Sequence, residues 1–206
     1  MRDVSKHLDF VVDCINEIPY NRAIILTGPN GSGKSLVRKQ ISFRLKNDNK
    51  KGKVQQVSMQ LRTGANMFGL GAFVHDSDWD STSGHTYYLV SSLIESCIKE
   101  KSEDYIVIDE PEIGMSKESQ LAVAHLIRDN IDAILGNNLG LMVITHSEVI
   151  VKELKDVCDF KYLDIDRQDM TADEWINREI TETNFDELRE WTHQLFLEIT
   201  KRSKQH

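Results

Sequence analysis

The chain has 206 residues, of which 40% are hydrophobic and 28% charged, and its formal net charge is −8. These values predict one folded domain over residues 1–206 and argue against a disordered chain. The acidic balance also argues against a protein that binds nucleic acid or anionic lipid through its overall charge. No apolar run is long enough to cross a membrane, and Cys14, Cys97 and Cys158 have no metal-ligand spacing, so we expect free thiols and a soluble, cytoplasmic protein.

Apolar periodicity predicts helices, and short continuous apolar runs that end at polar or glycine residues predict buried parallel strands. The expected helices cover 3–18, 34–46, 85–100, 117–135 and 147–155, and the expected strands cover 23–28, 53–60, 105–109, 139–145 and 159–164. This alternation predicts an α/β fold with three layers, a mostly parallel sheet and helices on both faces.

The predicted core covers about 20–165, and a helical tail covers about 171–204. The tail is acidic at first and then helical in its periodicity. Its expected packing anchors are Trp175, Trp191, Leu195, Phe196 and Ile199. We therefore expect a helical appendage at the C-terminal side of the core.

The segment GPNGSGKS, residues 28–35, lies between a predicted strand and a predicted helix and matches G-x-x-x-x-G-K-[ST]. Glycines let the backbone turn tightly, so that successive N–H groups point at phosphate oxygens, and the helix adds its positive end. Lys34 would reach the β- and γ-phosphates, and the Ser35 hydroxyl would ligate Mg²⁺. The residues expected to hold the nucleotide are Asn30, Gly31, Ser32, Gly33, Lys34, Ser35 and Leu36. A glycine-rich turn without a ligand is the alternative.

Asp109 and Glu110 follow the apolar run YIVI, where ligands bind in open α/β sheets. Asp109 is expected to hold Mg²⁺, and Glu110 to act as the general base for the water that attacks the γ-phosphate. A solvated acidic pair at a strand end is the alternative. The sequence therefore predicts a Mg·ATP site of the P-loop NTPase type.

His146 ends the predicted strand LGLMVIT, which we expect to lie beside the strand of Asp109. From there its imidazole would donate to a γ-phosphate oxygen; a structural histidine is the alternative. Gln60, at the end of the second predicted strand, is a further candidate for the nucleotide and Mg²⁺. Glutamine is common in this segment, so the residue type alone is weak evidence.

These motifs, in this order, resemble the ABC-type ATPase superfamily, in particular its soluble, non-transporter branch. The resemblance covers about residues 20–165 and rests on GPNGSGKS, STSGH, IVIDEPE and ITHS. It implies a homodimer that closes on ATP. It also implies a site completed in trans by a signature loop, here Thr82, Ser83 and Gly84. The match to that loop is partial, and a plain helix cap is the alternative.

Two features depart from the ABC-type pattern. The segment between Gln60 and Ser81 is too short for a transporter's helical insert or a coiled-coil arm and has a length closer to that of MutS-type ATPases. The aromatic residue that would stack on the base is also unassigned, with Tyr20 as the candidate. The resemblance further implies a role in DNA metabolism, phage biology or defence, with a protein partner such as a nuclease, or DNA.

The leading hypothesis is thus an ATPase that hydrolyses Mg·ATP and dimerises with ATP. A P-loop kinase of small molecules or nucleotides shares the phosphate loop but needs an arginine-rich lid, and Arg62 is the one arginine between residues 45 and 127. A regulatory subunit that binds ATP without hydrolysis is the third possibility, although it does not require Glu110.

Overall fold

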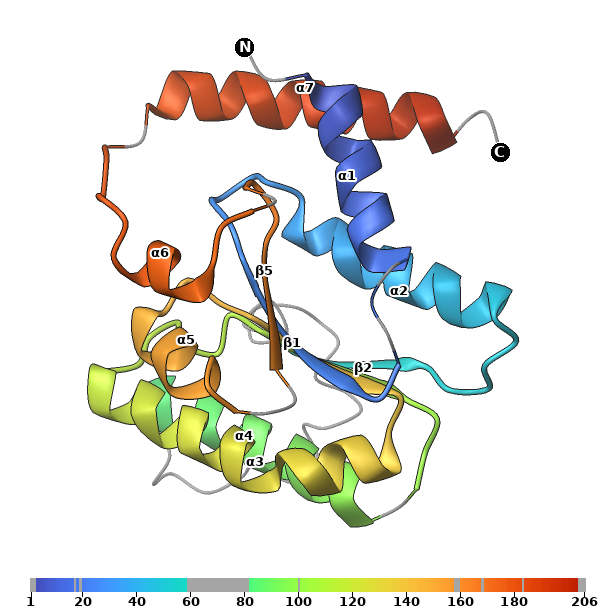
Figure 1. Cartoon of the computed structure of the whole chain (residues 1–206), viewed down its shortest axis with the longest axis vertical. Coiled ribbons are helices and arrows are strands. Elements are labelled where there is room, and N and C mark those ends of the chain that lie inside the picture. The colour runs from blue at the N-terminus through green and yellow to red at the C-terminus, as the bar shows by residue number, and fades with distance from the viewer. Residues whose placement is uncertain are drawn as a thin grey trace.

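The computed structural model describes residues 3–16, 18, 20–58, 82–99, 101–157, 160–167, 169–182 and 184–203, except for the side chains at positions 35, 82, 83, 85 and 203. Helices and strands alternate along these segments (Figure 1). The helices are α1 (Val4–Asn16), α2 (Lys34–Asn47), α3 (Thr82–Lys99), α4 (Lys117–Asn137), α5 (Glu148–Leu154), α6 (Ala172–Ile176) and α7 (Phe185–Ser203). The strands are β1 (Arg22–Thr27), β2 (Val54–Ser58), β3 (Tyr105–Asp109), β4 (Gly140–Ile144) and β5 (Phe160–Asp164).

The five strands form one sheet in the order β2-β3-β4-β1-β5, and every neighbouring pair is parallel. The predicted parallel α/β fold is therefore confirmed, and so is the predicted neighbourhood of β3 and β4. In this order β4 lies between β1, which leads into the phosphate loop, and β3, which ends at Asp109. All strands run in one direction, so their carboxyl ends meet at one edge of the sheet.

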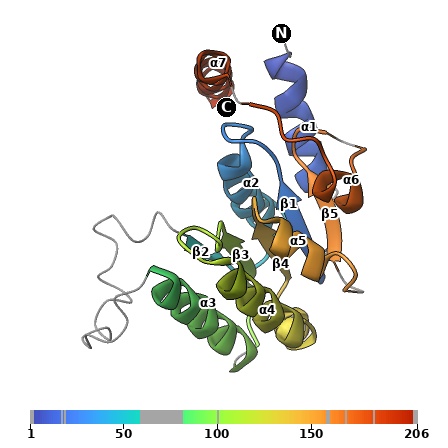
Figure 2. The same cartoon turned by 90° about the vertical axis from the view of Figure 1, so that its left-hand side faces the viewer.

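Helices cover both faces of the sheet (Figure 2). On one face, alternate residues of β1 such as Ala23 and Ile25 are buried against a cluster that includes residues of α3, α4, α5 and α6. On the other face, Ile24 and Leu26 are buried in a cluster with α1 and α2. The alternation follows from the period of two along a strand, and a strand covered on both sides must be apolar throughout.

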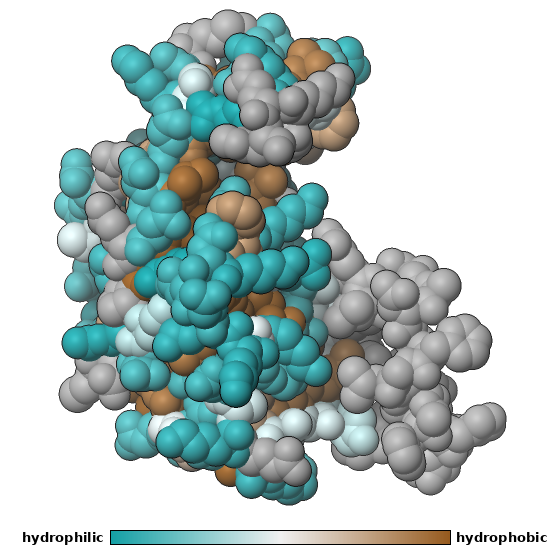
Figure 3. Space-filling model, turned by 90° about the vertical axis from the view of Figure 1, so that its right-hand side faces the viewer, coloured by the Kyte–Doolittle hydropathy of each residue, from teal (hydrophilic) through white to brown (hydrophobic). Residues whose placement is uncertain are grey.

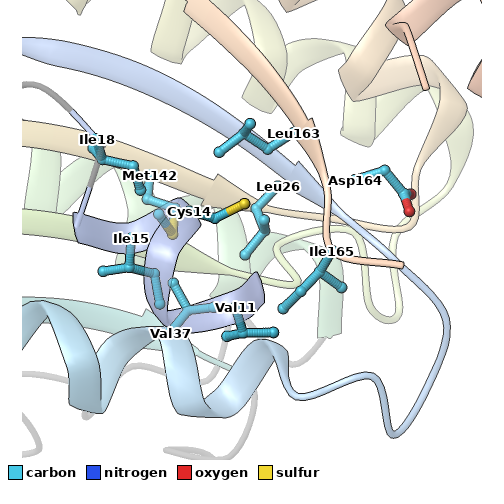
Figure 4. A pocket seen from close by; sticks show the side chains of 10 residues that line it. All are labelled: Val11, Cys14, Ile15, Ile18, Leu26, Val37, Met142, Leu163, Asp164 and Ile165. Atoms are coloured by element: carbon cyan, nitrogen blue, oxygen red, sulfur yellow. The ribbon is translucent and has the colours of Figure 1, made fainter. Parts of the chain in front are cut away.

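Helix α1 packs closely against the sheet (Figure 4). Its side chains Val11 and Ile15 are buried, and Leu26 of β1 and Met142 of β4 lie opposite them. The remaining cavity between these layers has a volume of only about 10 Å³, which is too small for an organic ligand. This part of the molecule is therefore a packed core.

The element boundaries differ from the prediction by a few residues. The first helix ends at Asn16, and α3 begins at Thr82 where 85 was expected. The predicted end of the second strand and the segment between Gln60 and Ser81 lie outside the described residues. In the described part of the chain, no helix has both the length and the apolar character needed to span a membrane.

The C-terminal helix α7 lies across α1 at the top of the molecule in Figure 1. Arg202 of α7 donates from Nη1 to Asp9 Oδ1 (2.7 Å) and from Nη2 to Ser5 Oγ (2.7 Å). Leu195 is buried as predicted, but Phe196 is 64% exposed, so its predicted role as a packing anchor is wrong. On a helix, neighbouring residues point about 100° apart, so only one of this adjacent pair can face the core.

Candidate functional site

The loop between β1 and α2 has the backbone conformation that a phosphate loop needs. Gly28, Gly31 and Gly33 have φ values of 148°, 73° and 98°, a region that favours glycine. A Cβ atom at Gly28 would lie 2.2 Å from Cγ2 of Ile165, which follows β5 directly. The loop therefore packs directly against the residue that follows β5, and there is no space for a side chain at residue 28.

Lys34 closes the loop from its C-terminal end. Its side chain is only 8% exposed, and Nζ donates to the carbonyl oxygens of Gly28 and Pro29, each at 2.9 Å. Burial lowers the pKa of Lys34, and the nearby carboxylates, Glu110 first, oppose this effect. The ammonium thus lies within electrostatic range of the carboxylates at the ends of β3 and β5.

Ser32 lies within the same loop and is 2% exposed, and its Oγ is buried without a hydrogen-bond partner in the described part of the structure. An unpaired buried hydroxyl is costly, and such a group in a native protein calls for an explanation. A bound anion that accepts from Ser32 would supply the missing partner. Asn30 and Gly31 are exposed, and the side chain of Ser35 is outside the described set.

Asp109 and Glu110 lie at the carboxyl end of β3. Burial raises the pKa of Asp109, and the adjacent charge of Glu110 adds to this effect. Contact with His146 lowers the pKa of Glu110, against the effect of burial. Two adjacent carboxylates are thus held in different electrostatic environments, a pattern that occurs at functional sites.

Glu110 has a φ of 50°, which is unusual for a residue with a side chain, and its N–H donates to the carbonyl oxygen of Ile144 (2.8 Å). This bond joins the turn after β3 to the end of β4. Its Oε1 lies 3.3 Å from Nε2 of His146. His146 Nε2 is buried and has no hydrogen bond of regular geometry among the described residues, so its polar neighbour at the strand ends is the Glu110 carboxylate.

Two residues that the sequence did not single out orient Asp109. Gln56 of β2 donates from Nε2 to Asp109 Oδ2 (2.9 Å), and Arg38 of α2 donates to Gln56 Oε1 (2.6 Å). The parallel register pairs Ser58 with Asp109, so Gln56 reaches it from two positions earlier on the neighbouring strand. The alternation along the strand was visible in the sequence, but the register that makes this diagonal pair was not.

Glu112 was also missed, and it fixes the position of His146. Its Oε2 accepts from the Thr145 hydroxyl (2.8 Å), and its Oε1 accepts from the backbone N–H of His146 (2.6 Å). On the other side of the histidine, Ser147 caps α5 by accepting from the N–H of Ile150 (3.1 Å). His146 is therefore held from both directions, and the repeated carboxylate in DEPE was the available sequence signal.

We expect Glu112→Gln to lower kcat about tenfold while the KM for ATP stays within about twofold, because small displacements of catalytic groups are costly. A glutamine has one acceptor oxygen, so one of the two bonds to Thr145 and His146 is lost. Steady-state ATPase kinetics measure the split. Glu118→Gln, at an exposed position in the first turn of α4, is the matched control. An unchanged kcat would show that Glu112 does not position the site.

Helix α7 covers the outer side of the phosphate loop. A Cβ atom at Gly31 would lie 2.6 Å from Thr192 Oγ1 and 3.2 Å from Leu188 Cδ1. His7 of α1 donates from Nε2 to the Ser32 carbonyl oxygen (2.7 Å), and its ring meets Trp191 edge to face at 5.2 Å. The predicted appendage is therefore part of the wall around the loop, which its sequence did not reveal.

Three further predictions concern residues away from the loop and the ends of β3 and β4. Gln60 lies outside the described residues. Thr82, Ser83 and Gly84 lie in the first turn of α3, and their action on a second subunit stays a prediction. Tyr20 is wrong as the base-stacking residue, because Arg44 covers its ring at 4.5 Å and its hydroxyl donates to Asp48, beyond the C-terminal end of α2.

The described residues contain no group of three His, Cys, Asp or Glu side chains that could hold a metal ion. A metal at this edge of the sheet would have Asp109 as a candidate ligand, with Ser35 as the further ligand predicted from the sequence, and would take the others from phosphate and water. That donor set suits Mg²⁺, which usually keeps several waters and binds through one or two carboxylates plus substrate phosphates.

Comparisons with known proteins give no family assignment. No family model matches the sequence, and no curated protein matches it. Among solved structures, a HORMA:CdnC:Trip13 complex of E. coli MS115-1 matches with 15% identity and a TM-score of 0.43 over 70% of this chain and 48% of that chain. PCH-2 of C. elegans matches with 20% identity and a TM-score of 0.42 over 80% of this chain and 42% of that chain. This chain thus spans less than half of either, and similarity at this level carries no argument about function.

The prediction of an ABC-type ATPase is wrong, because no family model matches the sequence and the two solved structures named above are a Trip13 complex and PCH-2. The physical reason is that triphosphate chemistry requires these motifs in any such enzyme. They are a glycine loop with a lysine, a carboxylate pair, and a polar residue at the end of the next strand. These motifs therefore do not distinguish one family from another. The nuclease or DNA partner rested on the same resemblance and stays a prediction.

Proposed function

We propose that this chain binds ATP with Mg²⁺ and hydrolyses its terminal phosphate. The observation that carries the proposal is the buried pair of donors in the glycine loop, the Lys34 ammonium and the unpaired Ser32 hydroxyl. The carboxylates of Asp109 and Glu110 lie close enough for their charges to act on Lys34. A triphosphate with its cation would satisfy both sets of groups at once.

Each residue then has a defined task. Lys34 and the loop N–H groups neutralise phosphate charge, and Glu110 accepts a proton from the attacking water. His146, whose Nε2 lies 3.3 Å from Glu110 Oε1, donates from this nitrogen to a γ-phosphate oxygen. Mg²⁺, when bound, would neutralise charge on the phosphates, with Asp109 and Ser35 as its protein ligands. Gln56 keeps the Asp109 carboxylate turned toward this position.

The direct test is phosphate release from ATP by the purified chain with Mg²⁺ and no acceptor. We expect multiple turnovers, and we expect them to stop when EDTA removes the metal. A kinase would be nearly idle without an acceptor and would transfer phosphate when one is added. A regulatory subunit would bind ATP with no turnover under either condition. Either outcome would overturn the hydrolytic proposal.

The proposal includes a second copy of this chain that closes on the bound nucleotide. What supports it is the surface beside the site. Ile113, next to Glu112 and three residues from Glu110, is an apolar side chain that is 39% exposed, and Asn30 and Gly31 of the loop are exposed as well. These exposed residues lie in the turn after β3 and in the phosphate loop, where a second copy would reach the bound nucleotide.

A further inference from the structure

The nucleoside of the proposed nucleotide has no assigned site, because Tyr20 is excluded. A groove of about 650 Å³ lies between α1, α2 and α7. Its volume falls within the range of small-molecule sites, about 300–1,000 Å³. Figure 3 shows apolar side chains in the hollow between α7, at the top, and the body of the molecule.

The groove begins where the phosphate loop ends. Leu36 is the residue that follows Ser35, and it lines the groove together with Gln40 and Phe43, which continue the same face of α2. Helix α7 extends from the phosphate loop to the groove. Its residues Leu188 and Thr192 face Gly31, and its residue Ile199 lines the groove. A nucleotide with its phosphates at the start of α2 can therefore extend into this groove.

The lining suits a base and a ribose. The walls are mostly apolar, with Val12 of α1 opposite the face of α2, and they can cover the flat surfaces of a base. Phe43 is 61% exposed, so an aromatic ring is available at the mouth. Gln40 adds an amide that both donates and accepts, which can hydrogen-bond the polar edge of a base.

A lining residue of the groove also joins two of its walls. Arg202, at its α7 side, donates to Asp9 Oδ1 and Ser5 Oγ on α1 and to Glu198 Oε1 on its own helix. These bonds join α7 to α1 without a ligand. A site formed in advance costs less conformational entropy on binding.

We propose that this groove binds the base and ribose of the nucleotide whose phosphates occupy the loop at residues 28–35. The inference rests on the proposed function, since it assumes that the loop binds a nucleoside triphosphate. It goes further in naming the groove between α1, α2 and α7 as the site that recognises the nucleoside.

Calorimetric titration with two probes, Mg·ATP and inorganic tripolyphosphate with Mg²⁺, tests the assignment. The native chain should bind ATP at least about tenfold more tightly than tripolyphosphate, because only ATP fills the groove. Val12→Trp places an indole in the groove and should reduce the ATP affinity about tenfold while the tripolyphosphate affinity stays unchanged. Asp13→Trp, at an exposed neighbouring position on α1, is the matched control and should change neither.

A second variant covers the case in which Val12→Trp fails to fold. Phe43→Ala removes an exposed ring at the mouth and should weaken ATP binding several-fold with the tripolyphosphate affinity unchanged. The groove assignment is overturned if folded variants keep the native ATP affinity. If the native chain binds neither probe, the proposed function itself fails, so the two failures are distinguishable.

Discussion

Lys34→Ala is expected to weaken Mg·ATP binding about tenfold to a hundredfold and to reduce turnover about 10²- to 10³-fold. The ammonium is buried and donates to the Gly28 and Pro29 carbonyl oxygens, so it is already in place at the mouth of the loop. A hydrogen bond to a charged group contributes about 1.5–3 kcal/mol, which corresponds to this loss of affinity. Titration calorimetry and a phosphate-release assay measure the two effects.

Lys46→Ala is the control for charge, because Lys46 is an exposed lysine on the same helix that does not line the groove. Its effect on turnover should be less than about threefold, since an exposed charge is screened by solvent. Thermal unfolding of both variants checks that the fold is intact. If Lys34→Ala retained native affinity and turnover with a native melting curve, the loop would not be a phosphate site.

Glu110→Gln is expected to reduce ATP turnover about 10²- to 10⁴-fold while Mg·ATP binding is retained. The amide has nearly the shape of the carboxylate but cannot accept a proton from water. It also loses the charge that lies 3.3 Å from His146 Nε2. Binding should survive because the loop and Lys34 are unchanged. Single-turnover kinetics with Mg·ATP separate the chemical step from binding, with Glu118→Gln as the control.

The same variant tests the dimer. With hydrolysis blocked, the ATP-bound form should accumulate, and sizing chromatography with ATP should show a species of twice the mass. A variant that binds ATP but elutes as a monomer would contradict the dimer without affecting the hydrolytic proposal. A variant with native turnover would show instead that another group activates the water.

Much of the fold was predictable because its strands are buried on both sides. Such strands are short, continuous apolar runs, and β1, β3 and β4 were each recognisable from their residues alone. Their ends then identified Asp109 and His146 as neighbours, which the pairing of β3 with β4 confirms. In these places the local sequence and the tertiary structure depend on the same property, the burial of apolar side chains.

The supporting contacts were not predictable for a different reason. Gln56 reaches Asp109 through the register of two strands, and Glu112 reaches Thr145 across a turn. Neither contact can be inferred from the spacing of these residues along the chain. The same holds for α7, whose contact with Gly31 joins residues that are far apart in sequence. The family resemblance was wrong because it relied on motifs that triphosphate chemistry alone requires.

The position of α7 has a consequence for folding. Domains begin to fold from their N-terminal side during synthesis. Thr192 and Leu188 of α7 contact Gly31 across most of the described chain, and α7 follows all five strands of the sheet in chain order. A growing chain would thus contain every strand of its sheet before its phosphate loop has an outer wall. The competence to bind ATP would then appear as the last step of maturation, after the secondary structure is already in place.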